Sequence, residues 1–204
     1  MLTKIRRQDC LEKYQVFPLR SYNEERDEEE FFSPKTYKSY ILTLPSKSFK
    51  GHIKLLATEL TNLTERLPST TLLFLGDNEL PWLHQDNDYK PAKEAQQYLA
   101  SHKVGKRFNG ALQVDISELP TFTKHLCWLT RCNAAHPYFH FIDDQQNILG
   151  HICQYGNLHL YLLKAKMSKP IERLIETSKF ILSNENCSNQ FGKTNGIKGI
   201  KIQV

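Results

Sequence analysis

Carboxylates follow two of the apolar segments that the sequence predicts to be strands. Asp77 comes just after the segment 70–75, and Asp115 comes just after a strand that ends at Val114. If the two strands run parallel, both carboxylates lie at the carboxyl edge of the sheet, where open α/β sheets usually bind ligands. Hard cations such as magnesium prefer oxygen ligands, so an acidic site at Asp77 and Asp115 would suit a metal-dependent hydrolase or phosphoryl-transfer enzyme.

Ordinary turn chemistry accounts for the same acidic residues. The sequence Gly-Asp-Asn at 76–78 is a common turn after a strand, and Asp86 to Asp88 has the composition of a helix entry. Glu79 lies in the same stretch. We therefore expect no metal site and no bound cofactor, and the acidic enzyme is kept as an alternative hypothesis.

Four histidines fall within a stretch of 24 positions, namely His136, His140, His151 and His159. The strand pairing that we expect separates them, because it places His151 on the apolar face of the sheet and both His140 and His159 on the opposite face. A buried histidine such as His151 is more often hydrogen-bonded in the core than bound to a ligand. The histidines by themselves therefore predict no metal centre.

The cysteines are odd in number and include no Cys-x-x-Cys pair: Cys10, Cys127, Cys132, Cys153 and Cys187. Neither a disulfide framework nor a zinc knuckle is indicated, so we expect free thiols. A cysteine–histidine nucleophile, Cys153 with His151 or Cys127 with His125, is an open alternative. It is not favoured, because Cys153 and His151 are expected on the core face, where a thiol is inert.

The most basic short cluster is Lys103, Lys106 and Arg107, with Gly105 and Phe108 interleaved. Contact with phosphate or nucleic acid is one interpretation. A solvated loop between a helix and a strand is favoured, because three charges make a small electrostatic footprint. The sequence contains no P-loop, no Gly-x-Gly-x-x-Gly motif and no nucleophile elbow. Nucleic-acid binding is therefore the third hypothesis.

Length and composition predict one globular domain over residues 1–204. The chain is 40% hydrophobic, long enough for one sizeable core, and carries a formal charge of +5. It has neither an apolar run of about 18 residues nor the apolar core of a signal peptide at its start. We therefore expect a cytoplasmic protein without membrane contact.

The two ends of the chain are less well determined by pattern. Residues 1–35 hold a short expected strand at 14–19 and the acidic run Asn23 to Glu30. Such a run is usually a solvated loop or exposed helical turn. The functional alternative is a docking surface for a basic partner. Residues 183–204 form a polar tail that ends in a segment, 197–204, predicted to be an edge strand or disordered.

Between these ends, strands and helices alternate and predict an α/β (α+β) fold. We expect strands at 39–44, 70–75 and 110–115, and helices at 48–67, from Pro91, at 119–133 and from Ser168, the last with an apolar side continuing to Leu182. The order strand, helix, strand at 39–75 indicates a crossover and a parallel pair. The predicted whole is a mixed sheet with helices packed on it.

The stretch 137–163 predicts a three-stranded antiparallel meander that ends the sheet. Turn compositions separate its apolar runs at 143–147 and at Gly156-Asn157. A two-residue turn at Gly156-Asn157 would pair His151 with Leu162. The buried face predicted from this pairing comprises Phe139, Phe141, Leu149, His151, Leu160 and Leu162.

The favoured function is a non-catalytic protein-binding domain, because catalytic signatures are missing and charge is segregated along the chain. A small cytoplasmic inhibitor of the immunity-protein kind is an example of suitable size and character. The loop 77–89 follows a central strand, and binding residues are often found on loops so placed. Its expected contacts to a basic partner surface, such as the active site of a nuclease, are Asp77, Glu79, Trp82, Asp86, Asp88 and Tyr89. In the alternative interpretation Trp82 folds back as a lid on the core.

Overall fold

The computed structural model describes residues 1–132, 138–183, 187 and 189–191. Within these residues one open sheet dominates the molecule, and each neighbouring pair of its strands is antiparallel. Its strands are, in spatial order, β1 (Leu2–Ile5), β6 (Ala111–Asp115), β5 (Thr71–Gly76), β7 (Phe139–Asp143), β8 (Ile148–Ile152), β9 (Leu158–Leu162), β4 (Lys38–Thr43) and β10 (Ile181–Leu182).

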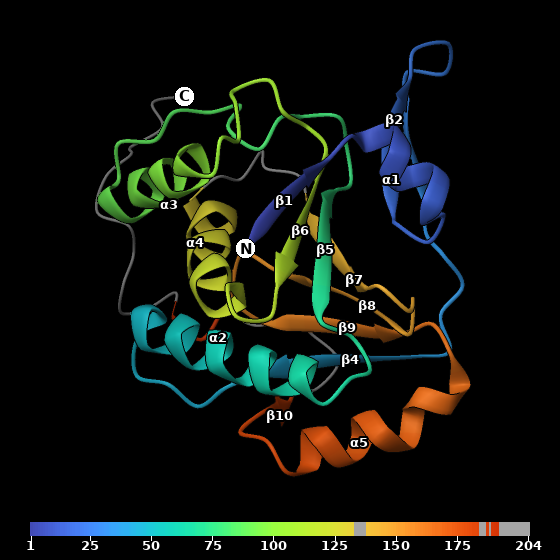
Figure 1. The fold of residues 1–204 in the computed structure, drawn as a ribbon, viewed down its shortest axis with the longest axis vertical. Coiled ribbons are helices and arrows are strands. Elements are labelled where there is room, and N and C mark those ends of the chain that lie inside the picture. The colour runs from blue at the N-terminus through green and yellow to red at the C-terminus, as the bar shows by residue number, and fades with distance from the viewer. Residues whose placement is uncertain (133–137, 184–186, 188, 192–204) are drawn as a thin grey trace.

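A separate two-stranded hairpin stands apart from the main sheet, formed by β2 (Leu19–Asn23) and β3 (Glu28–Phe32). It projects from the body of the molecule at the upper right of Figure 1. The helices are α1 (Arg7–Lys13), α2 (Phe49–Glu65), α3 (Lys90–Ser101), α4 (Leu119–Cys132), the 3-10 turn η1 (Ala165–Met167) and α5 (Ser168–Glu176).

Helix α2 shows how the sequence specifies a local element. Ser48 caps its first turn by accepting the backbone N–H of Gly51 at 3.2 Å. Apolar residues then recur in steps of three and four, which places them on one stripe. The buried stripe comprises Phe49, Ile53, Leu56, Leu60 and Leu63. Because α2 buries this stripe against the sheet, burial rather than propensity stabilises it.

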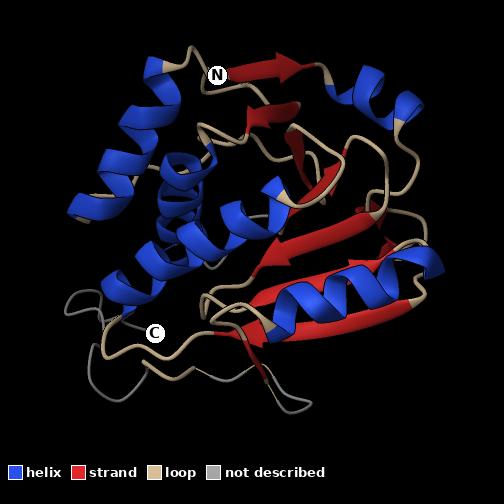
Figure 2. Cartoon of the chain, turned by 60° about the horizontal axis from the view of Figure 1, so that its bottom comes forward, coloured by secondary structure: helices blue, strands red, loops and turns tan. Residues whose placement is uncertain are grey.

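The larger core lies between the sheet and four helices. Residues of α2, α3, α4 and α5 join one apolar cluster with strand residues such as Phe74, Phe141 and Leu160. Figure 2 turns the lower edge of the molecule forward and shows α5 lying over the strands at that edge. Glu172 of α5 accepts a hydrogen bond from Lys38 of β4 at 2.5 Å, which ties this helix to the edge of the sheet. We call this side of the sheet the helix-covered face.

The opposite side, the N-terminal face, is covered only in part. Residues Cys10, Tyr14 and Phe17, from α1 and the loop after it, pack on Leu73, Leu75 and their neighbours in β6, β7 and β8. The strands β9 and β4 lie outside this second apolar cluster, except for Tyr161 at its margin. The N-terminal face therefore has a covered half and a more open half.

The predicted class, the helices and the terminal meander are confirmed, but the predicted parallel pair is wrong. Strands β4 and β5 flank α2 and point the same way, yet β9, β8 and β7 lie between them. The meander enters this gap after α4, so each strand of the crossover gains antiparallel neighbours. The order of strands in the sheet is set here by the antiparallel pairing of β7, β8 and β9 through short turns. A local β-α-β pattern cannot reveal this order.

The register of the meander also differs from the prediction. His151 pairs with His159, not with Leu162, and Gly150 pairs with both Phe141 and Leu160. The helix-covered face thus takes Ile148, Gly150 and Ile152 from β8, while Leu149 and His151 move to the N-terminal face. Phe139, Phe141, Leu160 and Leu162 are buried as predicted. This register buries both isoleucines of β8 against the helices and Leu149 under α1 on the other face, and a longer turn of 153–157 accommodates the shift.

Smaller differences lie at the chain ends. Helix α5 ends at Glu176, where Thr177 and Ser178 direct their hydroxyls to backbone carbonyls of its last turn, and a two-residue strand at 181–182 follows. The expected strand at 14–19 begins instead at Leu19, and β1 and α1 were not predicted. The expected edge strand at 197–204 falls outside the described residues. In the described part of the chain, none of the helices has the length and apolar character that crossing a bilayer requires.

The contact between Gly150 and Phe141 generates a prediction about stability. A Cβ at Gly150 would lie 2.4 Å from Cζ of Phe141 and 2.9 Å from the carbonyl oxygen of His159. Gly150→Ala should therefore lower the free energy of unfolding by about 1–3 kcal/mol through overpacking. Urea denaturation measures this, with Gly105→Ala as control because a Cβ there meets nothing within 4 Å. Adding Phe141→Leu should recover part of the loss, and an equally unstable double variant would contradict the account.

Candidate functional site

The predicted contact loop 77–89 has an inward part and an exposed part. Asp77 and Trp82 are buried, whereas Glu79, Asp86, Asp88 and Tyr89 are exposed. Asp86 lies 3.7 Å from the ammonium of Lys106. The structure therefore brings only four of the six predicted contacts to the surface.

Trp82 belongs to the core and is 1% exposed. Its indole stacks on Phe139 with ring centroids 3.8 Å apart, and its Nε1–H donates to the carbonyl of Gly110 at 2.8 Å. This is the lid-like arrangement that the sequence left open. The prediction of Trp82 as a surface anchor is corrected, because its ring packs inside the fold and its one polar atom is hydrogen-bonded there.

Asp77 and Asp115 do not form a common site. Because β5 and β6 are antiparallel, Asp115 pairs with Thr71 at the start of β5, while Asp77 follows the end of that strand. Six residues of strand separate the two levels, or roughly 20 Å at about 3.3 Å per residue. The acidic site that required parallel strands is therefore not assembled in this fold.

Asp77 instead joins three segments of the backbone. Its Oδ1 accepts the N–H of Tyr138 at 3.1 Å, its Oδ2 lies 3.5 Å from Nε of Arg20, and its carbonyl accepts the N–H of Arg20. Burial raises the pKa of Asp77, and Arg20 and the Tyr138 N–H oppose that rise. The residue holds β2 against the ends of β5 and β7.

The basic cluster occupies an exposed turn between α3 and β6. Lys103, Lys106 and Arg107 are all exposed, and Lys4 donates to the carbonyl of Lys103 at 2.7 Å. Asp86 faces Lys106, which reduces the positive charge of the turn. The cluster therefore lies in an exposed turn between a helix and a strand, and Lys4 adds a fourth basic side chain beside it.

The β2–β3 hairpin carries three exposed aromatic side chains. Every residue of β3 is exposed, and Tyr22, Phe31 and Phe32 have exposed fractions of 58%, 67% and 49%. The acidic run 23–30 forms the turn and much of β3, so it is a solvated hairpin and not a loose loop or helical turn. We call Tyr22, Glu28–Glu30, Phe31 and Phe32 the hairpin surface.

A cavity of about 290 Å³ lies between the hairpin and the N-terminal face of the sheet. Its lining includes Phe31 and Phe32 from the hairpin and Tyr138, His140 and Tyr161 from the side of the sheet. Asp77 is also part of the lining. A pocket of this kind, with aromatic walls and few polar groups, is typical of a binding site.

Three histidines line up across the strands beside this cavity. His140, His151 and His159 occupy paired positions of β7, β8 and β9 and share the N-terminal face. The rings of His151 and His159 stack with centroids 4.4 Å apart, and that of His140 lies 4.9 Å from His151. Burial lowers the pKa of all three imidazoles, so the neutral forms are favoured.

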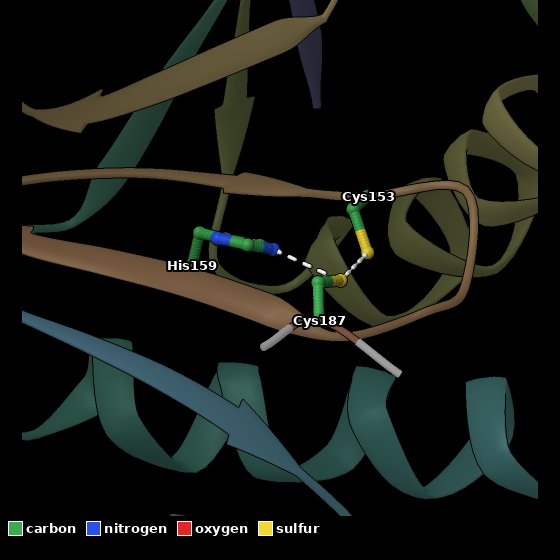
Figure 3. Close-up of side chains that lie close together, drawn as sticks. All are labelled: Cys153, His159 and Cys187. Atoms are coloured by element: carbon green, nitrogen blue, oxygen red, sulfur yellow. Dashed lines mark hydrogen bonds between the residues drawn. The ribbon is translucent and has the colours of Figure 1, made fainter. Parts of the chain in front are cut away.

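Beyond His159 the row continues into a pair of thiols (Figure 3). Sγ of Cys187 lies 3.4 Å from Nε2 of His159 and 3.1 Å from Sγ of Cys153, and the side-chain amide of Asn157 donates to Cys187 at 3.1 Å. Burial is the main cause that raises the pKa of Cys153 to about 12. All five cysteines are free thiols in the structure. The three donor atoms of Cys153, His159 and Cys187 lie within 4.8 Å of one another.

Sequence reasoning missed this cluster for two reasons. The predicted register of β8 against β9 was wrong by three residues, which placed His151 and His159 on opposite faces, whereas the alternation of Ile148, Gly150 and Ile152 would have indicated a shared face. Cys187 reaches His159 across 28 positions, and no pattern in the polar segment before it signals that approach.

Comparison with known proteins found no family model, curated sequence or solved structure that matches the chain.

The position of Trp82 predicts a structural effect of its removal. Trp82→Ala should lower the free energy of unfolding by about 3–5 kcal/mol, because it leaves a cavity and an unpaired carbonyl at Gly110. Chemical denaturation measures the loss. Tyr89→Ala, at a ring that is 43% exposed, should cost under about 1 kcal/mol. Equal effects of the two changes would show that Trp82 is not a core residue.

The burial of His140 predicts a dependence of stability on pH. Its pKa is lowered to about 3 from the ordinary 6.5, so the unfolded chain binds this proton more readily than the folded one. The free energy of unfolding should fall as pH drops below 6.5, by up to about 1.4 kcal/mol per pH unit. Between about pH 7 and about pH 5, His140→Gln should lose about 2 kcal/mol less than the wild type in urea unfolding. Parallel pH profiles would contradict this assignment.

Proposed function

We propose that the protein is a non-catalytic binding domain that docks a basic protein partner through the hairpin surface. The observation that carries the proposal is the exposure of β3, which presents Phe31 and Phe32 to solvent directly beside three glutamates. Adjacent large aromatic residues left uncovered on a monomer commonly mark an interaction site. The hairpin therefore replaces the loop 77–89 as the proposed contact.

Aromatic anchors supply the expected binding energy. Phe31 lies across from Arg20 on one face of the hairpin, and Phe32 lies across from Leu19 on the other. A hairpin held to the body by Arg20 and Asp77 presents these rings with little freedom to lose on binding. Interfaces concentrate their energy in a few such anchors.

Charge favours a basic partner over an acidic or neutral one. Residues 19–32 contain six carboxylates and two arginines, a net charge of −4, although the whole chain is +5. Arg26 contacts both Glu28 and Glu30, and Arg20 approaches Glu29, yet four carboxylates remain in excess. Such a surface attracts a basic partner from a distance and disfavours acidic ones.

The cavity beneath the hairpin adds a place for one side chain of the partner. Its aromatic and apolar walls suit an inserted ring or the stem of an arginine. A small cytoplasmic inhibitor that occludes a basic active site, of the immunity-protein kind, would use a surface of this chemistry. The free thiols are those of a reducing compartment, which supports the cytoplasmic location within the same proposal.

Site-specific photo-crosslinking in the native cell tests where the partner binds. A photoreactive phenylalanine analogue at Phe31 should capture a discrete basic protein. The same probe at Asp86, in the originally predicted loop, and at Glu176, on exposed α5, should not capture it. Capture of the same protein from Asp86 but not from Phe31 would move the contact back to the loop 77–89.

Binding of the identified partner to purified variants tests the chemistry. Phe31→Ser combined with Phe32→Ser should weaken the Kd by roughly 30-fold or more, as for other hot-spot anchors, with an unchanged melting temperature. Glu28→Lys combined with Glu30→Lys should slow association by roughly 10-fold at low salt. The matched charge reversal Glu176→Lys should change neither quantity. Wild-type affinity in the double phenylalanine variant would refute the proposal.

A further inference from the structure

The donor atoms at the turn between β8 and β9 are arranged as a metal-binding set. We propose that Cys153, His159 and Cys187 bind a single zinc ion. The proposal is independent of the docking function, because the three residues lie outside the hairpin surface and outside the lining of the cavity. It assigns a role to three residues for which the sequence predicted no metal.

Distances between the donors are close to those of a tetrahedral zinc site. With Zn–S of about 2.3 Å and Zn–N of about 2.0–2.1 Å, tetrahedral geometry separates two sulfurs by about 3.8 Å and a sulfur and a nitrogen by about 3.5 Å. The structure has 3.1 Å between the two Sγ atoms and 3.4 Å between Nε2 of His159 and Sγ of Cys187. The third pair, Sγ of Cys153 and Nε2 of His159, lies within 4.8 Å, so side-chain adjustments on the order of 1 Å would admit the ion.

The elements that carry the donors hold them in place. Cys153 closes the turn after β8 by two backbone hydrogen bonds, from its N–H to Asn157 and from Gly156 to its carbonyl. His159 lies within β9, and its ring is stacked against His151. The donors therefore come from a constrained hairpin, with Cys187 added from the chain beyond β10 (Figure 3).

The surroundings suit a metal-bound thiolate. The side-chain amide of Asn157 donates to Sγ of Cys187, a contact that stabilises negative charge on the sulfur and orients it. Outer contacts of this kind typically support the ligands of a metal site. Two thiolates and one imidazole select zinc over magnesium, calcium or manganese, which prefer oxygen. Three protein ligands leave the fourth position for a water molecule.

Oxidation of the two thiols to a disulfide is the competing use of the same geometry. An S–S bond requires about 2.05 Å, about 1 Å shorter than the present separation, and releases two protons and two electrons to an external oxidant. A disulfide would give His159 and Asn157 no role, although both contact Cys187. The two uses are separable by experiment, because only one of them binds a metal in the reduced protein.

Cobalt titration of the reduced full-length chain tests the proposal. The protein is stripped with a chelator and titrated with Co²⁺ without oxygen. One equivalent of cobalt should produce the visible bands of a tetrahedral site together with sulfur-to-cobalt charge transfer, and one equivalent of zinc should abolish both. Cobalt that binds without charge transfer, or a reduced protein that takes up none and instead forms the 153–187 disulfide in air, would overturn the proposal.

Variants identify the ligands. Cys187→Ser and His159→Gln should each weaken cobalt binding by more than about 100-fold, because even the loss of an outer-sphere partner costs roughly 10- to 100-fold. Both positions are half-buried, so the variants should fold, as circular dichroism verifies. Cys153→Ser should have the same effect on cobalt. Cys132→Ser, at another half-buried thiol, is the matched control and should bind as the wild type does. Unchanged spectra in Cys187→Ser would exclude the site.

Discussion

The close approach of Phe141 to Gly150 is the constraint on which the rest of the sheet depends. The Phe141 ring occupies the space where any other residue at 150 would place a Cβ. This contact fixes β7 against β8, and β8 in turn sets β9 through Gly150 and Leu160. Because side chains alternate along a strand, one register decides which residues of all three strands enter the helix-covered core.

The same register determines which polar side chains gather on the N-terminal face of the sheet. Sending the isoleucines of β8 toward the helices leaves His151 beside His140 and His159, and brings His159 to the end where Cys153 and Cys187 lie. Partial cover by α1 leaves this half of the N-terminal face less protected, and the hairpin stands over it with a cavity between. The metal proposal and the docking proposal thus share one origin in the alternation of β8 and β9, although they use different residues.

The sequence allowed the elements to be predicted better than their arrangement. Helices such as α2 follow from a period of three and four residues that burial enforces, and strand β5 follows from its uninterrupted apolar run. Strand order did not follow, because the meander inserts between β4 and β5 by contacts that no local pattern encodes. The candidate contacts at Asp77 and Trp82 were mistaken for the same reason, since burial of a loop is decided by the neighbours it meets. The exposure of Phe31 and Phe32 could not be predicted either, because it depends on how little of the rest of the described chain packs over them.

The strand order also constrains when the molecule can become complete during synthesis. β1 pairs with β6 more than 100 residues later, and β4 waits for β9 before it has an inner neighbour. Non-local pairings of this kind close large loops and slow folding. As the chain emerges from the ribosome, β4 and β5 therefore each have an unpaired edge until β7, β8 and β9 have been synthesised. β10, which pairs with β4, and Cys187, which contacts His159, come later in the sequence than every other described strand of the sheet. Until these residues have been synthesised, the outer edge of β4 near Thr43 stays unpaired, and this interval is the one in which a chaperone would have most to protect.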